Sequence, residues 1–262
     1  MYVIRKALRG LELAPGEAAA RAGQEEGAVT GLVDGHWNEE AARALAPVLG
    51  LDAAALAAHP RYEPPPGAHP AIRRLDMPFG EEERVNGWLV GGGGGGGKLL
   101  IDTGCDEASL AAVLADHGGP ETVGMVIITH NHGDHVGGLG LFRGLDVAAY
   151  GPGGGVKWRE MRPGDSLEFG GLGITAHDLA GHADPALGLE IEGLGTPVLA
   201  VGDALFAGSM GGCQGRTAYD LAHGTLRRVL EGRDDATLLL PGHGPATRLG
   251  AERVANPFCK GW

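Results

Sequence analysis

The chain has 262 residues, of which 43% are hydrophobic and 21% are charged, a composition typical of a globular protein with a sizeable core. Its net charge of -12 argues against binding to nucleic acid or to an anionic membrane, because both depend on a cationic surface. The three cysteines, Cys105, Cys213 and Cys259, are odd in number and far apart, so neither a disulfide framework nor a CxxC metal site is expected. Because no signal-like or membrane-spanning apolar segment is visible, we expect a cytoplasmic protein.

Residues 11–59 are rich in Ala, Leu and Glu, a composition that predicts a series of short helices. Asn38 and Asp52 stand where helices can begin, because their side-chain oxygens can accept hydrogen bonds from the free N–H groups of a first helical turn. We therefore predict a small all-α domain over residues 1–60.

Residues 13–59 resemble a Cro/repressor-type helix-turn-helix, on the small-residue turn in AARAGQEEGAVTGLVDG. The helix that would read DNA offers Gln24, Glu25 and Glu26, whereas contacts to phosphates and bases need cationic or amide side chains. Residues 1–60 together carry five basic and eight acidic side chains. We interpret them as a degenerate helix-turn-helix-like domain that forms a homodimer contact or covers the catalytic domain. The alternative is a DNA-binding regulator with a metal-containing sensor domain.

The proline-rich stretch PRYEPPPGAHP predicts an extended arm or linker at residues 61–71, followed by a catalytic domain at residues 72–262. That domain opens with two predicted strands, at residues 85–90 and 98–101, separated by seven consecutive glycines. We interpret the glycines as a flexible hairpin loop. A phosphate-binding loop is the alternative, but the GK[ST] ending and the helix that such a loop needs are absent.

The rest of the chain alternates apolar strands with helices, which predicts an α/β fold. Strands are predicted at residues 123–128, 147–150, 174–177, 187–191, 198–201 and 238–240, and helices at residues 107–116 and 219–230.

The segment VIITHNHGDHVGGLG places His130, His132, Asp134 and His135 directly after an apolar strand. Imidazole and carboxylate groups bind Zn²⁺ well, and a site with an open position lets water bind and lose a proton near neutral pH. His130 and His132 share a face in extended chain, whereas Asp134 and His135 fall past the turn. One loop can therefore supply ligands to two adjacent metals.

Three later residues follow strands in the same way, each flanked by Gly or Pro. They are His182 in LAGHADP, Asp203 in LAVGDALF and His243 in LLLPGHGP. The remaining histidines lack such a context, and exposed or packing roles are predicted for them: His36, His59, His69, His117, His177 and His223.

The motifs HNHGDH, GH, GD and PGHGP, in this order, resemble the metallo-β-lactamase superfamily over residues 72–262. The resemblance implies a four-layer αβ/βα sandwich with a dinuclear metal site. It also implies a role for each motif residue: His130, His132 and His182 as ligands of the first metal, Asp134, His135 and His243 as ligands of the second, Asp203 as the bridge between them, and Asp102 in LLIDTG as the supporting structural aspartate.

Two Zn²⁺ ions in such a site would hold a hydroxide between them, and one of them would polarise the carbonyl that the hydroxide attacks. Asp134 is the nearest candidate to move a proton, and we assign it a catalytic role. The cofactors predicted are therefore two Zn, with one Fe as the alternative.

The segment SMGGCQGRTAYD stands where short glyoxalase II-like thioesterases and persulfide dioxygenases carry a Gly-Arg-Thr-Asp-Phe motif. Gly215-Arg216-Thr217 agrees with that motif and makes Arg216 a candidate substrate-binding residue, but Ala218-Tyr219 replaces Asp-Phe. ERVANPF resembles the closing segment of the short members, and the glutathione-binding domain of full-length glyoxalase II is missing, which puts a glutathione thioester in doubt. We predict a dinuclear zinc hydrolase of an ester, thioester or lactone, with a mononuclear iron persulfide dioxygenase as the alternative enzyme.

Overall fold

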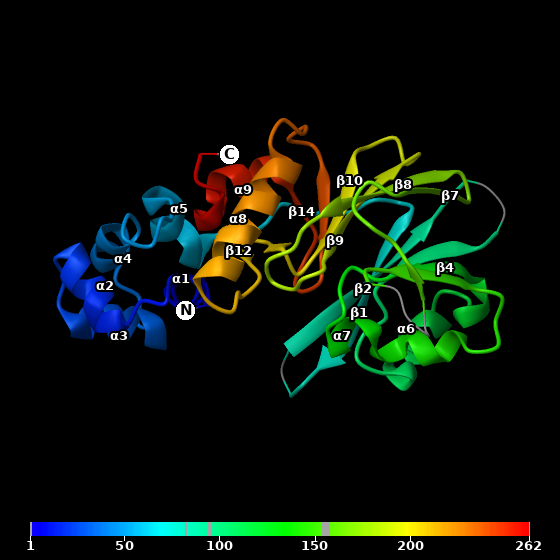
Figure 1. Cartoon of the computed structure of the whole chain (residues 1–262), viewed down its shortest axis with the longest axis horizontal. Coiled ribbons are helices and arrows are strands. Elements are labelled where there is room, and N and C mark those ends of the chain that lie inside the picture. Colours follow the sequence, from blue (N-terminus) through cyan, green and yellow to red (C-terminus); the bar gives the residue numbers. More distant parts are fainter. Residues whose placement is uncertain (1, 82, 94–95, 154–157, 262) are drawn as a thin grey trace.

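Two β-sheets lie face to face and form the centre of the part of the chain that the sequence predicts to be catalytic (Figure 1). The computed structural model describes residues 2–81, 83–93, 96–153 and 158–261. In these ranges the first sheet has the order β1 (Ile72–Phe79), β2 (Glu83–Gly91), β3 (Lys98–Ile101), β4 (Val123–Ile127), β5 (Ala148–Gly151), β6 (Arg159–Glu160). The second has the order β14 (Thr247–Arg248), β13 (Leu238–Pro241), β10 (Val198–Gly202), β9 (Leu187–Glu192), β8 (Leu172–Asp178), β7 (Ser166–Phe169).

The core between the sheets is built from alternate residues of the strands, since successive side chains of a strand point to opposite faces. Val90 and Ile101 of the first sheet and Ala200 and Leu240 of the second belong to this buried cluster. The other faces are apolar too, because each strand of a central sheet is covered on both sides. The predicted continuous apolar runs follow from that double burial.

Helices cover the two outer faces and complete the four-layer αβ/βα sandwich, so the predicted fold class is confirmed. The first sheet packs against α6 (Glu107–Ala115) and the 3₁₀ helix η3 (Gly137–Phe142) through a cluster that includes Leu110 and Phe142. The second packs against α8 (Arg216–Leu230), and α9 (Leu249–Ala255) follows β14. Short elements complete the fold: α7 (Gly133–Val136), the hairpin strands β11 (Leu205–Phe206) and β12 (Ser209–Met210), and the 3₁₀ helices η2 (Pro120–Thr122) and η4 (Pro257–Cys259).

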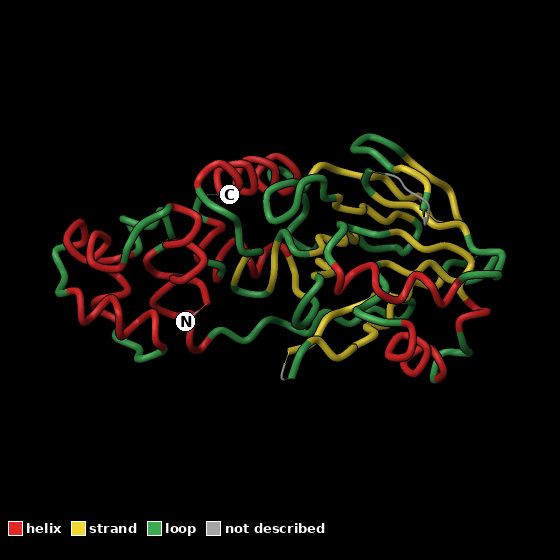
Figure 2. The backbone as a smooth tube through the Cα atoms, turned by 60° about the horizontal axis from the view of Figure 1, so that its bottom comes forward, coloured by secondary structure: helices red, strands yellow, loops and turns green. Residues whose placement is uncertain are grey.

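The N-terminal region is helical, as predicted, and gathers at one end of the molecule (Figure 2). Its elements are α1 (Tyr2–Leu11), α2 (Pro15–Ala22), α3 (Glu26–Asp34), α4 (Glu39–Leu45), α5 (Ala53–Ala58) and the 3₁₀ helix η1 (His59–Arg61). Both predicted caps are confirmed: the side chain of Asn38 accepts a hydrogen bond from the N–H of Ala41, and that of Asp52 from the N–H of Ala55.

These helices share one hydrophobic cluster with the catalytic part. Ile4 and Leu45 belong to the same buried group as Leu226 of α8 and Phe258 of η4. Gly10 of α1 lies so close to the ring of Tyr219 that a Cβ atom would collide with it. The N-terminal helices therefore cover the catalytic part, one of the two uses that the sequence suggested, whereas the homodimer stays a prediction.

The proline-rich arm joins the N-terminal helices to β1, and the glycine run lies between β2 and β3. Residues 62–69 form no helix or strand, and the backbone of Gly67 lies against Ala246. Strands β2 and β3 pair antiparallel up to Gly91 and Lys98, the arrangement expected of a hairpin, although Gly94 and Gly95 lie outside the described residues. Among the residues described here, none of the helices combines the length and apolarity that crossing a bilayer requires.

Candidate metal centre

Seven side chains singled out from the sequence come together where strands of both sheets end. His130 and His132 follow β4, and Asp134 and His135 lie on α7 directly after them. The other three come from the second sheet, in the segments after β8, β10 and β13: His182, Asp203 and His243.

One group consists of three imidazole nitrogens that face one another. The Nε2 atom of His130 lies 3.0 Å from Nδ1 of His132, which in turn lies 3.1 Å from Nε2 of His182. In a tetrahedral zinc site with Zn–N bonds of about 2.0–2.1 Å, the ligand nitrogens are about 3.3–3.4 Å apart. The three nitrogens are therefore spaced nearly as ligands of one ion would be.

A second group consists of Asp134, His135 and His243. The Oδ2 atom of Asp134 lies 3.6 Å from Nε2 of His135 and 3.3 Å from Nε2 of His243. One carboxylate and two imidazoles suit Zn²⁺ and iron alike.

The carboxylate of Asp203 lies between the two groups. Its Oδ2 atom is 3.4 Å from Nε2 of His182, in the first group, and 3.4 Å from Nε2 of His243, in the second. Its Oδ1 atom is 3.4 Å from Nε2 of His135. This single side chain can therefore reach ions held by either group.

The outward nitrogens of four of these histidines each have an oxygen partner. A neutral imidazole that donates its N–H outward keeps the lone pair of its other nitrogen for a metal. The pairs are His130 Nδ1 with Thr129 Oγ1 at 3.1 Å, His135 Nδ1 with Asp102 Oδ2 at 2.9 Å, His182 Nδ1 with the carbonyl of Gly212 at 2.8 Å, and His243 Nδ1 with the carbonyl of Arg84 at 2.6 Å. The ring orientations thus turn the Nε2 atoms toward the centre.

Two buried polar atoms at the centre show that a metal ion fits. Within the described part of the chain, Nε2 of His135 and Oδ1 of Asp203 are buried without a hydrogen-bond partner. An unsatisfied buried polar atom costs about 1–3 kcal/mol, so native proteins leave few of them. A cation between the two atoms would satisfy both.

The charges at the centre also suit metal binding. Burial lowers the pKa of His130 to about 2 and lowers that of His182, so both rings are neutral at pH 7. Burial disfavours the charged form of Asp203, but the nearby rings of His135 and His243 outweigh it and hold the pKa of Asp203 well below the usual range. Similarly, burial lowers the pKa of His135, yet the carboxylate of Asp102 opposes it and the net direction is upward. At His243, too, burial is outweighed by the neighbouring carboxylates, which raise its pKa to about 10. The centre therefore offers neutral imidazole from His130 and His182 next to the ionised carboxylate of Asp203.

Asp102 braces the loop that carries four of the seven side chains. It follows β3 with φ of 59°, a left-handed conformation that Asp tolerates better than most residues. Its carboxylate accepts hydrogen bonds from the N–H and the hydroxyl of Thr129, both at 2.8 Å, in addition to the contact with His135. These contacts are those of a residue that positions ligands.

Sequence reasoning missed the residues that hold the His243 loop. The side-chain amide of Asn86, on β2, donates to the carbonyls of Pro241 at 2.9 Å and Gly244 at 2.7 Å, and the indole of Trp88 donates to Pro241 at 2.8 Å. The signal available in the sequence was the polar Asn86 inside the apolar run VNGWLV. In the structure its side chain is fully buried. Gly242 lies so close to Asp203 that a Cβ atom there would collide with its carboxylate, which explains the glycine before His243.

The hairpin β11–β12 lies beside the candidate metal centre, where Phe206 packs against His243. The segment ERVANPF anchors this hairpin. Glu252 is fully buried, and its carboxylate accepts hydrogen bonds from the N–H of Gly208 at 2.8 Å and the hydroxyl of Tyr62 at 2.6 Å. Thr247 and Asn256 donate to the same carboxylate at 2.7 and 2.9 Å. The terminal segment therefore has a structural function that its sequence did not reveal.

We expect Glu252→Ala to lower the free energy of unfolding by about 3 kcal/mol, since it leaves several buried donors without an acceptor. Urea denaturation followed by circular dichroism measures the change. The control is Glu231→Ala, because Glu231 is exposed and pairs only at the surface with Arg227. Equal stability of the two variants would contradict the anchoring role of Glu252.

Arg216 is not brought together with the seven side chains. It begins α8, where its guanidinium pairs with Asp220 at 2.8 Å, and both residues line a cavity of about 350 Å³ that faces Val48 and Leu49. Its substrate-binding role stays a prediction.

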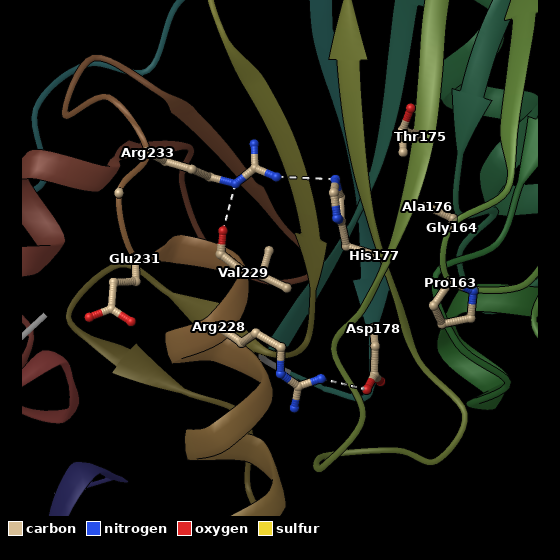
Figure 3. A pocket seen from close by; sticks show the side chains of 11 residues that line it. Pro163, Gly164, Thr175, Ala176, His177, Asp178, Arg228, Val229, Glu231 and Arg233 are labelled. Carbon is tan, nitrogen blue, oxygen red and sulfur yellow. Dashed lines mark hydrogen bonds and ion pairs between the residues drawn. The ribbon is translucent and has the colours of Figure 1, made fainter.

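Most of the other histidines lie in contacts of their own. His59 pairs with the carbonyl of Gly208 and His69 with that of Leu194, and His223 packs against Tyr219. Figure 3 shows His177 and Arg233 in an open cavity of about 490 Å³. Among the described residues that line this cavity, none is one of the seven candidate metal ligands. Asp178 and Arg228 form an ion pair in the same cavity. Arg233 and Glu231, which also line the cavity, pair with Glu190 and Arg227 respectively.

Comparison with known proteins places these motifs in a family context. The sequence profile of the metallo-beta-lactamase superfamily matches residues 80–243. An uncharacterised protein of Mycobacterium leprae is 34% identical over 38% of this chain and 46% of its own length, so the match spans about half of that relative. A human metallo-beta-lactamase domain-containing protein 1 is 34% identical over 58% of this chain and 59% of its own. A ribonuclease Z of Methanopyrus kandleri is 31% identical over 36% and 40%.

Solved structures share the fold. ETHE1 from Myxococcus xanthus superposes with a TM-score of 0.58 and 26% identity, over 71% of this chain and 83% of that one. A protein crystallised in a di-iron-bound form, TTHA1623, superposes with a TM-score of 0.53 and 26% identity, over 70% and 98%.

Proposed function

The chain belongs to the metallo-β-lactamase superfamily, and we propose that it is a dinuclear metal-dependent hydrolase of an ester, thioester or lactone. The observation that carries the proposal is the position of Asp203 between two separate groups of ligands. A carboxylate in that place is what a pair of adjacent cations needs to offset their mutual repulsion. The partial Gly-Arg-Thr motif at residues 215–217 is one that thioesterases share with persulfide dioxygenases, so it supports the thioesterase and its iron alternative alike.

His130, His132 and His182 would hold one metal, and Asp134, His135 and His243 the other. When bound, the pair would acidify a water molecule and polarise the carbonyl oxygen of the substrate. The chain itself supplies the rigidity: Asp102 fixes the ring of His135, and Asn86 fixes the loop of His243.

Asp134 is the group of this chain that we propose to accept and return the proton. Burial works to raise its pKa, but the hydrogen bond with His243 and the nearby ring of His135 outweigh burial, and its pKa lies below the ordinary value. The carboxylate is therefore ionised at neutral pH, as a proton acceptor must be.

We propose zinc in both sites, with one iron per chain as the alternative, and a small-molecule substrate in the cytoplasm. The likeness to a protein crystallised in a di-iron-bound form supports iron as the alternative. A small substrate is supported by the exposed Glu25 and Glu26 at the start of α3, because carboxylates there repel a nucleic-acid backbone. The likeness to a ribonuclease makes a phosphodiester the substrate class to test beside carbonyl compounds.

Protein purified without added metal should contain close to two zinc equivalents per chain. Elemental analysis measures this, and activity toward matched thioester, lactone and phosphodiester compounds identifies the substrate class. Adding a chelator should remove metal and activity together, and adding zinc should restore both. One iron per chain with oxygen consumption on a persulfide would instead establish the dioxygenase.

A further inference from the structure

Lys6, on the first helix, reaches the hairpin β11–β12 beside the candidate metal centre. Its ammonium donates to the carbonyl of Met210 at 2.6 Å and to the hydroxyl of Ser209 at 3.2 Å, and it lies 4.7 Å from the centre of the Phe206 ring. An ammonium has three donors. Two of them meet oxygen atoms of the hairpin, and the ammonium also lies over the aromatic face of Phe206, so three groups of the hairpin contact this charge.

The ammonium stays charged in that place. Burial lowers the pKa of Lys6 to about 8, and the carboxylate of Asp203 opposes the effect of burial. At pH 7 most molecules therefore keep the charge–aromatic contact with Phe206.

The hairpin is connected to three of the candidate ligands. Asp203 lies two residues before its first strand, and Phe206 packs edge-on against His243 with 5.8 Å between the ring centres. After the hairpin, the carbonyl of Gly212 accepts the hydrogen bond that orients His182. A displacement of the hairpin would therefore move ligands of both proposed metals.

Helix α1 also contacts β2, the strand next to the His243 loop. The hydroxyl of Tyr2 donates to Glu83 at 3.3 Å, and Glu83 is the neighbour of Arg84, whose carbonyl orients His243. Figure 1 shows α1 beside β12, between the other N-terminal helices and the catalytic part. Helix α1 thus contacts both the hairpin β11–β12 and strand β2, on which candidate ligands depend.

We propose that the N-terminal helical region is a working part of the metal centre, and that Lys6 is the positioning residue through which α1 fixes Asp203, His182 and His243. The inference rests on the proposed function, because it concerns the affinity for the proposed metals. It explains why an acidic helix-turn-helix-like region is packed against a hydrolase.

The test compares Lys6→Met, which keeps the apolar stem and removes the ammonium, with Arg5→Met on the same helix. Arg5 contacts only Val33 and Asp34 of the helical region in the hydrogen bonds and ion pairs of the described residues. Zinc affinity is measured by competition with a chromophoric chelator. We expect Lys6→Met to weaken it about 10-fold, the smaller of the effects usual for an outer partner of a metal ligand, and Arg5→Met to leave it unchanged.

Two further measurements separate positioning from general stability. The visible spectrum of the cobalt-substituted protein should change in Lys6→Met, because the ligand geometry changes, and should keep its wild-type form in Arg5→Met. Lys6→Arg should restore part of the affinity. If Lys6→Met does not fold, Ser209→Ala, which removes one acceptor of the ammonium, should weaken zinc binding several-fold.

The outcomes are distinguishable. Wild-type zinc affinity and an unaltered cobalt spectrum in a folded Lys6→Met or Ser209→Ala protein would overturn the inference while leaving the proposed function intact. A wild-type chain that takes up no transition metal would overturn the proposed function and the inference with it.

Discussion

Asp203→Ala should lose most of the bound metal and nearly all hydrolytic activity. The substitution removes the only carboxylate that lies within 3.4 Å of both His182 and His243 among the described residues, so two cations would face each other without the anion between them. We expect a loss of activity greater than the roughly 10–100-fold typical of an outer-shell partner, because a direct ligand is removed. Elemental analysis and steady-state kinetics on the same preparation measure both effects.

The matched control for Asp203→Ala is His36→Ala. His36 is exposed on the N-terminal helical region and has no part in the two ligand groups. It should keep wild-type metal content and rate. Full metal content and full activity in Asp203→Ala would disprove the bridging assignment.

Deleting residues 1–60 should leave a chain that aggregates. The deletion uncovers side chains that now pack against α1 and its neighbours: Leu205, Met210, Tyr219, Leu226 and Phe258. Each large apolar side chain gains about 1.5–3 kcal/mol from burial, and the total stability of a domain is only about 5–15 kcal/mol. The lost burial is therefore comparable to the whole stability of the remaining fold.

Soluble yield, light scattering and near-ultraviolet circular dichroism measure the effect of the deletion. The control is co-expression of residues 1–60 with residues 61–262 as separate chains, which restores the apolar contact without the covalent link and should restore solubility. A truncated chain that is monomeric, folded and as stable as the full one would show that the shared cluster contributes little.

The sequence alone determined the fold class and the set of candidate ligands. The α/β character and the candidate residues follow from local patterns, whereas the four-layer sandwich and the role of each ligand were implied by the resemblance to the superfamily. Apolar runs of the length of a strand predict buried strands, and a polar side chain directly after such a run must lie at an edge of the sheet. His130, Asp203 and His243 were found in this way, and so was the cap at Asn38, because its hydrogen bond reaches only three residues along the chain.

Only the tertiary structure decided which residues support the site. Lys6 meets Met210 across 204 positions of sequence, and Asn86 meets Gly244 across 158. No local pattern encodes such pairs, since they exist only once both sheets and the helices have packed. For the same reason the sequence predicted a domain boundary at the proline-rich arm. In the structure, apolar residues that precede the arm and apolar residues that follow it pack into one cluster. Periodicity shows that a face is apolar, but the partner that buries it is chosen by the shape of the folded chain.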